Sequence, residues 1–291
     1  MEALKACYGD TSSDSDYESA SSSPTLVHSE GFTPLPPPPV SLLNPPNSLG
    51  IYCFNGEGSQ DFLTSQTSRI RSFPHVDGNY ALHVYIPVCI PSPSKKELAA
   101  FLKKVSSHEP SLHAVDVDLP LNILCKNEEK LERAVLEREF HVSLGRTVPI
   151  RVHQIDSMVS MLRQKLQTQQ RYWIDFSKWE VFVNDDYTRT FLSLEVVKGG
   201  LREITKQIEA VNGVYKLHNL PEFYKDPRPH ISLAWALGDI GHSLKKVVEQ
   251  VIKRNTVESS VKKWAFTCKF KGIECKIGHK TYTICKISEG H

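Results

Sequence analysis

Apolar and polar residues alternate with a period of two along several stretches of the chain, which is the pattern of half-buried β-strands. Stretches with helical spacing of apolar residues separate them. The pattern predicts strands at 81–87, 113–119, 140–144, 173–183, 188–197 and 230–235, and a last group of strands within 261–287, where Gly272 and Gly278 mark turns. It predicts helices at 93–107, 151–169, 201–214 and 242–254.

The order of these elements repeats along the chain. Strand 81–87, a helix, an HVSL strand and a second helix are followed later by strand 188–197, a helix, an HISL strand and another helix. Two similar units imply two lobes related by an approximate internal dyad. We therefore predict an α+β fold in which each lobe is an antiparallel sheet with helices on its outer side. The cleft between the lobes would receive one copy of the motif from each.

Residues 1–65 have a different composition from the rest of the chain. They combine a Ser/Asp/Glu run with a proline tract, which cannot bury enough apolar surface to offset chain entropy. We predict a disordered acidic, Ser- and Pro-rich tail at 1–65 and a bilobal domain at 66–291. A phosphorylated segment or a ligand for a proline-binding module is the alternative to a simple solvated tail.

Charge and cysteine content narrow the class of partner. Residues 1–65 hold eight Asp and Glu and one Lys, which leaves 34 Lys and Arg against 25 Asp and Glu in 66–291, a net charge of +9. A basic domain suits a polyanionic partner such as nucleic acid. The seven cysteines form no C-x-x-C pair or zinc-finger spacing, and we expect reduced thiols. No signal-peptide pattern or membrane-length apolar stretch occurs, so we expect a protein that binds no membrane.

Two copies of a His-x-Ser pattern carry the candidate chemistry. His141 and Ser143 belong to Phe-His-Val-Ser-Leu, and His230 and Ser232 belong to Pro-His-Ile-Ser-Leu. Because residues i and i+2 of a strand share a face, each strand presents an imidazole and a hydroxyl on one face and apolar side chains on the other. Two copies in a matching order of elements favour a shared site over two unrelated strand histidines.

Two such pairs fit phosphodiester chemistry on RNA. One imidazole can take the proton of a ribose 2′-OH, which attacks the adjacent phosphorus, while the other protonates the departing 5′ oxygen and a 2′,3′-cyclic phosphate remains. The serine hydroxyls can donate to the non-bridging phosphate oxygens. The same pair acting with water would open a cyclic phosphate. We expect no metal and no cofactor, and the residues do not assign which histidine is the acid.

Longer strings around the motifs carry a family resemblance. These are FPH and GNYALHVYIP near residue 73, TRTFLSLEV in the middle, and FYKDPRPHISLAW around the second motif. From about residue 71 to the C-terminus the chain resembles the 2H phosphoesterase superfamily, and within it the U6 snRNA phosphodiesterase branch. The resemblance implies a nuclear 3′–5′ RNA exonuclease that trims the oligouridine tail of U6 snRNA and leaves a cyclic or linear 3′ phosphate. We expect it to act as a monomer.

The resemblance also implies roles for individual residues. His141 and His230 would act as general acid and base, Ser143 and Ser232 would bind the phosphate, and Tyr224 would stack on the terminal base. The remaining residues expected at the substrate pocket are Val142 and Ile231 within the motifs, and Asp226, Pro227, Arg228 and Pro229 before the second motif.

Three assignments stay open at this point. Asp185 lies in an Asn-Asp-Asp turn and approaches the nucleotide in the resemblance, but turn chemistry alone explains it. Arg228 either touches a phosphate or faces solvent. His83 has no Ser or Thr two residues on, so a packed strand histidine is favoured over a third catalytic group.

Two other functions remain compatible with the sequence. The fold could serve a 2′,3′-cyclic phosphodiesterase that acts on another RNA or on a small nucleotide. It could also serve a module that binds RNA or a nucleotide without turnover, although the intact histidines and serines argue against that.

Overall fold

Two antiparallel β-sheets carry the two motifs. The computed structural model describes residues 76–117, 119–258 and 266–287, and the predicted tail at 1–65 lies outside them. The strands are β1 Asn79–Cys89, β2 His113–Ala114, β3 Glu139–Ser143, β4 Val148–Arg151, β5 Trp173–Val183, β6 Arg189–Val196, β7 His230–Leu237, β8 Phe266–Lys269, β9 Gly272–Ile277 and β10 Lys280–Lys286. One sheet has the order β10–β9–β1–β3, with β4 also paired to β1, and the other has the order β2–β7–β6–β5–β8.

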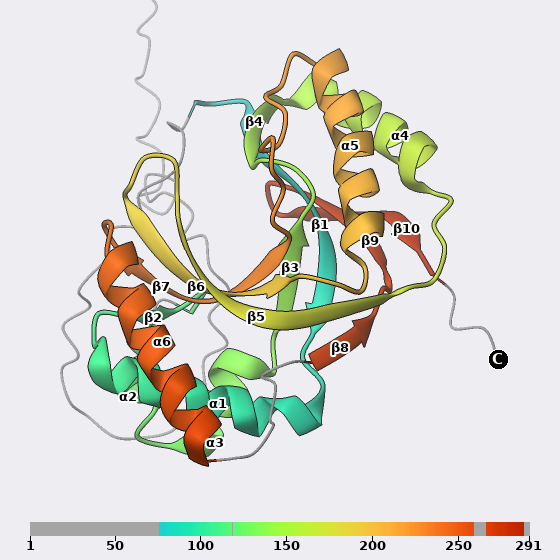
Figure 1. Cartoon of the computed structure of the whole chain (residues 1–291). Coiled ribbons are helices and arrows are strands. Elements are labelled where there is room, and N and C mark those ends of the chain that lie inside the picture. Colours follow the sequence, from blue (N-terminus) through green and yellow to red (C-terminus); the bar gives the residue numbers. More distant parts are fainter. Residues whose placement is uncertain (1–75, 118, 259–265, 288–291) are drawn as a thin grey trace, which may run out of the picture. The chain divides into compact units, whose positions relative to one another are not determined.

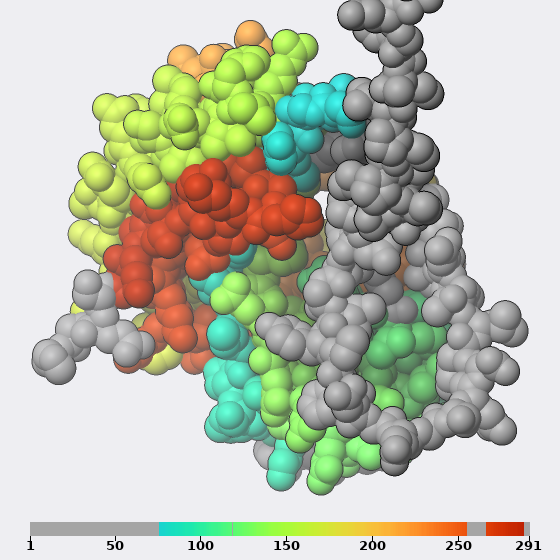
Figure 2. Space-filling model, turned by 180° about the vertical axis from the view of Figure 1, so that it is seen from behind, coloured from blue at the N-terminus to red at the C-terminus, as the bar shows by residue number. Residues whose placement is uncertain are grey.

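Helices cover both sheets (Figure 1). They are α1 Ser92–His108, α2 Leu121–Leu124, α3 Glu128–Leu131, α4 Ile155–Leu166, α5 Leu201–Leu217 and α6 Gly241–Glu258, with a π-helical turn at Glu132–Leu136 and a 3-10 turn at Val152–Gln154. α1 and α6 lie against the sheet that contains β5, while α4 and α5 lie together beside β9 and β10. Figure 2, seen from behind, shows the red β9–β10 segment at the surface next to the yellow-green α4. The predicted α+β class, with antiparallel sheets and outer helices, is confirmed.

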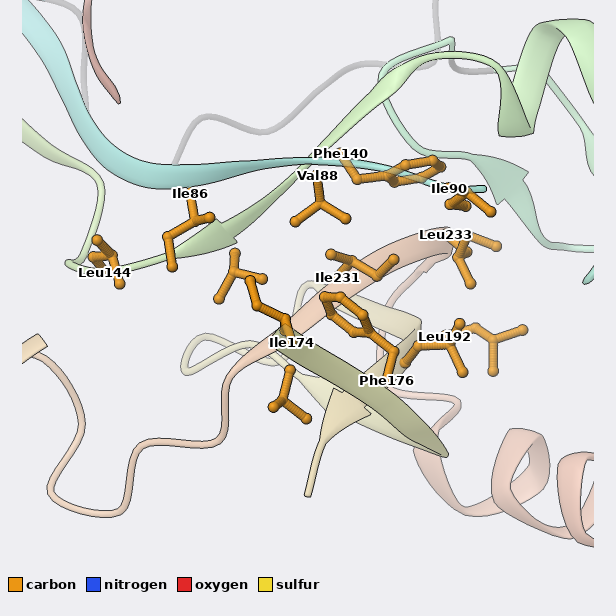
Figure 3. Packing of buried hydrophobic residues seen from close by; sticks show 14 of the residues in the cluster. Ile86, Val88, Ile90, Phe140, Leu144, Ile174, Phe176, Leu192, Ile231 and Leu233 are labelled. Atoms are coloured by element: carbon orange, nitrogen blue, oxygen red, sulfur yellow. The ribbon is translucent and has the colours of Figure 1, made fainter. Parts of the chain in front are cut away.

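The core forms where alternate residues of the strands point inward, most clearly along β1, β3 and β4. Along β1, Leu82, Val84, Ile86 and Val88 are buried, and the residues between them are more exposed. Figure 3 shows that apolar side chains from both sheets gather in one cluster, with Ile86 and Val88 of β1 near the side chains of β7. Burial of these apolar side chains away from water supplies the main driving force for folding. The opposite faces of β3 and β7 are thereby left for polar side chains.

The strand and helix predictions differ from the structure in three places. The strand expected at 113–119 is only the two-residue β2, because Asp116 has a positive φ of 63° that an extended strand does not allow. The helix expected at 151–169 begins later, since Val148–Arg151 forms β4 against β1. The short helices within 121–136 were not predicted, because none is long enough to show a clear period.

The two lobes exchange elements that the repeat alone does not reveal. β2, from the N-terminal half, pairs with β7, while β9 and β10, from the C-terminal end, extend the sheet of β1 and β3. Each sheet therefore depends on both halves of the chain. No helix within the described residues combines the length and apolar character that a membrane span requires.

Candidate active site

The two His-x-Ser motifs lie on β3 and β7 with their polar residues turned away from the core. The side chains of Val142 on β3 and of Leu144 directly after it are fully buried, as are those of Ile231 and Leu233 on β7, as the alternation predicts. Val142 and Ile231, which were expected at the substrate pocket, therefore have only their backbone available for the substrate. Their side chains belong to the core.

The structure brings the two motif histidines within electrostatic reach of each other. β3 and β7 lie in contact although they belong to different sheets. The proximity of His141 is one of the influences that lower the pKa of His230. The two imidazoles, one from each lobe, are therefore close enough to influence each other, as general acid–base chemistry on one phosphate would require.

His141 sits among aromatic rings of β1. The ring of His83 meets it edge-on at a centroid distance of 4.8 Å, and the ring of Tyr85 lies 5.7 Å away. Burial lowers the pKa of His141; the nearby Asp116 opposes this shift, and Arg138 adds to it. The lowered pKa favours the neutral form of the His141 imidazole in the free protein.

His230 is held by its own backbone and by a ring. Its Nδ1 lies 2.7 Å from the carbonyl oxygen of Arg228, and because a carbonyl only accepts, Nδ1 carries the proton. Its ring stacks on Phe182 at 4.1 Å with an interplanar angle of 18°. Burial lowers the pKa of His230, while the Arg228 carbonyl and Glu195 partly offset this. In the neutral form, Nε2 is left with its lone pair for the substrate.

An ion cluster lies beside His230. Arg228 Nε donates to Glu195 at 2.6 Å, and its terminal nitrogen donates to Glu180 at 2.6 Å and to Glu195 at 2.7 Å. Lys178 Nζ donates to the same two carboxylates at 2.9 and 3.2 Å. Burial alone would raise the pKa of Glu180, but the hydrogen bonds from Lys178 and Arg228 outweigh it and bring the pKa to about 2.

Arg228 thus has a partner that the sequence did not suggest. Its guanidinium is committed to Glu180 and Glu195 and lies 4.8 Å from the centroid of the Phe182 ring. The side chain is still 36% exposed, and the phosphate contact expected from the sequence stays a prediction. Arg228 supports the ring and the carbonyl that hold His230.

Tyr224 and Asp185 are brought together by a third residue, Arg146. The Arg146 guanidinium lies 4.1 Å from the centroid of the Tyr224 ring and donates to Asp185 at 2.7 Å. The Tyr224 hydroxyl lies 3.4 Å from Asp185, and Arg146 Nε donates to the carbonyl oxygen of Glu222 at 3.1 Å. Tyr224 stays 44% exposed, so ring surface remains available for a base.

The remaining predicted pocket residues precede His230 in the loop after α5. Asp226 is exposed, Pro227 is half-buried and Pro229 is buried, with its carbonyl accepting from the amide of Val196 at 2.8 Å. Within the described ranges, no group of three His, Cys, Asp or Glu residues is arranged to hold a metal ion.

Comparison with known proteins places the chain in a family. A family model named HVSL, described as an uncharacterised conserved protein, matches residues 36–285. U6 snRNA phosphodiesterase 1 of Xenopus laevis is 32% identical over 266 residues, covering 88% of this chain and 94% of the relative. The human protein of that name is 32% identical over 216 residues, covering 73% of this chain and 71% of the relative. This chain belongs to the U6 snRNA phosphodiesterase family.

Membership of the U6 snRNA phosphodiesterase family confirms the resemblance drawn from the motif strings. The solved structure of Usb1 from Kluyveromyces marxianus is also similar, with 15% identity, 70% of this chain and 97% of that chain covered, and a TM-score of 0.43.

The sequence alone did not identify several residues that lie at the candidate site. Glu180 and Glu195 are acids with apolar neighbours on both sides in the sequence, and the structure buries both. Acidic residues are rarely buried unless they are paired, so this local pattern is the signal that could have found them. Arg146 follows the first motif by only three residues, but nothing in the sequence indicates its contact with Tyr224. Phe182 gives no signal that separates it from an ordinary strand aromatic.

Proposed function

We propose that the chain is a 3′–5′ RNA exonuclease that trims the oligouridine tail of U6 snRNA by metal-independent transesterification. The RNA would end in a 2′,3′-cyclic or 3′ phosphate. The observation that carries the proposal is the pairing of His141 and His230, each with a serine two residues on, in a chain whose relatives are named U6 snRNA phosphodiesterase 1.

The proposed reaction uses only groups of the RNA and this chain. One neutral imidazole takes the proton of the 2′-OH, the 2′ oxygen bonds to the phosphorus, and the bond from phosphorus to the 5′ oxygen breaks. The other imidazole, protonated before the step, gives its proton to the departing 5′ oxygen. Ser143 and Ser232 donate to the non-bridging oxygens, where negative charge grows in the transition state.

Tyr224 positions the nucleotide in this proposal. Its exposed ring stacks on the terminal base, and Arg146 fixes the ring from the other side by a cation–π contact and by the pair with Asp185. Asp185 thus acts through Arg146, and Asp226, Pro227 and Pro229 shape the loop that carries Tyr224.

We also propose how the enzyme is organised. One chain supplies both histidines, which supports a monomer. The proposed substrate is a nuclear RNA, which supports action in the nucleus, with residues 1–65 as a tail and 66–291 as the catalytic domain.

A tailed-RNA assay tests the proposal. The full chain should remove 3′ uridines in the presence of a chelator, and His141→Ala and His230→Ala should each abolish this while leaving thermal unfolding close to wild type. His153→Ala, at an exposed histidine on the surface, is the matched control and should retain full activity. Full activity of either motif variant would contradict the mechanism.

A further inference from the structure

Each motif serine contacts a polar side chain of the strand beside it. Ser143 Oγ lies 3.0 Å from Nε2 of His83 on β1, and Ser232 Oγ lies 3.1 Å from the hydroxyl of Ser193 on β6. β1 pairs with β3, and β6 pairs with β7. One such contact therefore occurs in each sheet, at the hydroxyl proposed to bind the phosphate.

We infer that His83 is a positioning residue whose Nε2–H donates to Ser143, so that the single proton of the Ser143 hydroxyl is directed at the phosphate. This inference rests on the proposed function of the site. His83 was expected from the sequence to be a packed strand histidine, and its ring is indeed mostly buried, beside those of Tyr85 and His141.

The direction of the hydrogen bond follows from counting protons. A serine hydroxyl has one proton and can accept further hydrogen bonds, whereas a phosphate oxygen only accepts. If Ser143 gave its proton to His83, none would remain for the phosphate. A bound phosphate therefore selects the His83 tautomer that carries its proton on Nε2.

The opposite assignment, His83 as a base that activates Ser143, conflicts with its surroundings. Burial, the nearby His141 and the nearby Lys276 together lower the pKa of His83 to about 3. An imidazole of that basicity is a poor acceptor for a serine proton and stays neutral throughout the physiological range. His83 thus orients a hydroxyl and does not carry protons.

In the second lobe, Ser193 takes the place of His83 as the hydrogen-bond donor to the motif serine. Ser193 is fully buried, so its proton needs a protein acceptor, and the oxygen of Ser232 lies at hydrogen-bonding distance. Donation from Ser193 to Ser232 leaves the Ser232 proton free for the phosphate. A histidine and a serine thus play corresponding parts in the two halves of the site.

A double-mutant cycle tests the role of His83 on a uridine-tailed RNA. His83→Phe, which removes the donor, should lower kcat/KM about tenfold, the effect of one lost hydrogen bond. His83→Gln, whose amide N–H can replace Nε2–H, should recover most of that loss. In a Ser143→Ala background, His83→Phe should cause no further loss, because the oriented hydroxyl is already gone. His113→Phe, on β2 beside Trp235, controls for loss of a strand histidine.

The outcomes separate this inference from the proposed function. A wild-type chain that removes no uridine would refute the function itself. An active wild type in which His83→Phe costs the same factor with and without Ser143 would refute only the positioning role. If His83→Phe unfolds, the same cycle with His83→Asn, whose shorter amide falls short of Ser143, decides the question.

Discussion

Removal of the Arg228 guanidinium tests the ion cluster beside His230. Arg228 donates to both Glu180 and Glu195, whose side chains are only about a tenth exposed. Breaking a buried pair by removing one partner costs about 3–5 kcal/mol. Lys178 still contacts both carboxylates, and the Arg228 side chain is 36% exposed, so Arg228→Met should cost less, about 2–3 kcal/mol of unfolding free energy. In a domain of this size, that lowers Tm by about 5–10 °C.

The loss should depend on pH in a stated direction. The folded-state pKa of Glu180 lies at about 2, below its ordinary value of 4.5, so its contribution to stability is fully present above pH 4.5 and disappears as the pH falls towards 2. Without Arg228, the folded-state pKa rises. The gap in Tm between wild type and Arg228→Met should therefore be full at pH 7 and smaller at pH 4.

Calorimetry or circular dichroism at the two pH values measures this gap. Arg202→Ala, which removes one positive charge from an exposed position on α5, is the matched control and should change Tm little. Adding Glu180→Gln and Glu195→Gln to Arg228→Met should restore much of the stability by removing the uncompensated charges. An equal gap at both pH values, or no recovery in the triple variant, would refute the electrostatic account of the cluster.

Three further predictions concern the site and its support. Tyr224→Ala should raise KM by about 5- to 100-fold in a uridine-release assay, which corresponds to the free energy of stacking one base on an aromatic ring. Tyr224→Phe keeps the ring and should stay near wild type, and equal losses in the two variants would contradict stacking. The pH profile of kcat/KM should have both limbs below 6.5, because burial lowers the pKa of both motif histidines. Asp116→Asn should shift the His141 limb further down, and a limb that moves up would contradict this. Gly145→Ala should lower stability by about 1–3 kcal/mol in urea unfolding, because its Cβ would lie 2.9 Å from the buried Tyr215 hydroxyl; wild-type stability would contradict that contact.

The sequence predicted most of what local periodicity controls. Strand alternation placed His141 and His230 on the polar faces of β3 and β7, because a period of two leaves one choice of face. The repeat predicted two sheets. The same alternation predicted that the side chains of Val142 and Ile231 are buried. The family resemblance placed both residues at the substrate pocket without distinguishing side chain from backbone.

Tertiary neighbours account for what the sequence could not predict. Arg146, Glu195 and Ser193 act through residues tens of positions away, and no local pattern records which strand lies beside which. The exchange of β2, β9 and β10 between the sheets has the same cause, since short strands with similar alternation fit either sheet edge.

The chemical nature of the product ends tests the central claim most directly. A uridine-tailed oligonucleotide, incubated with the full chain and a chelator, is analysed by mass spectrometry, alongside a copy with one 2′-deoxy nucleotide within the tail. Transesterification by two histidines predicts RNA ends that carry a cyclic or linear phosphate, and trimming that stops where the 2′-OH is missing. Ends with a free 3′-hydroxyl, or trimming that continues past the deoxy nucleotide, would contradict the account.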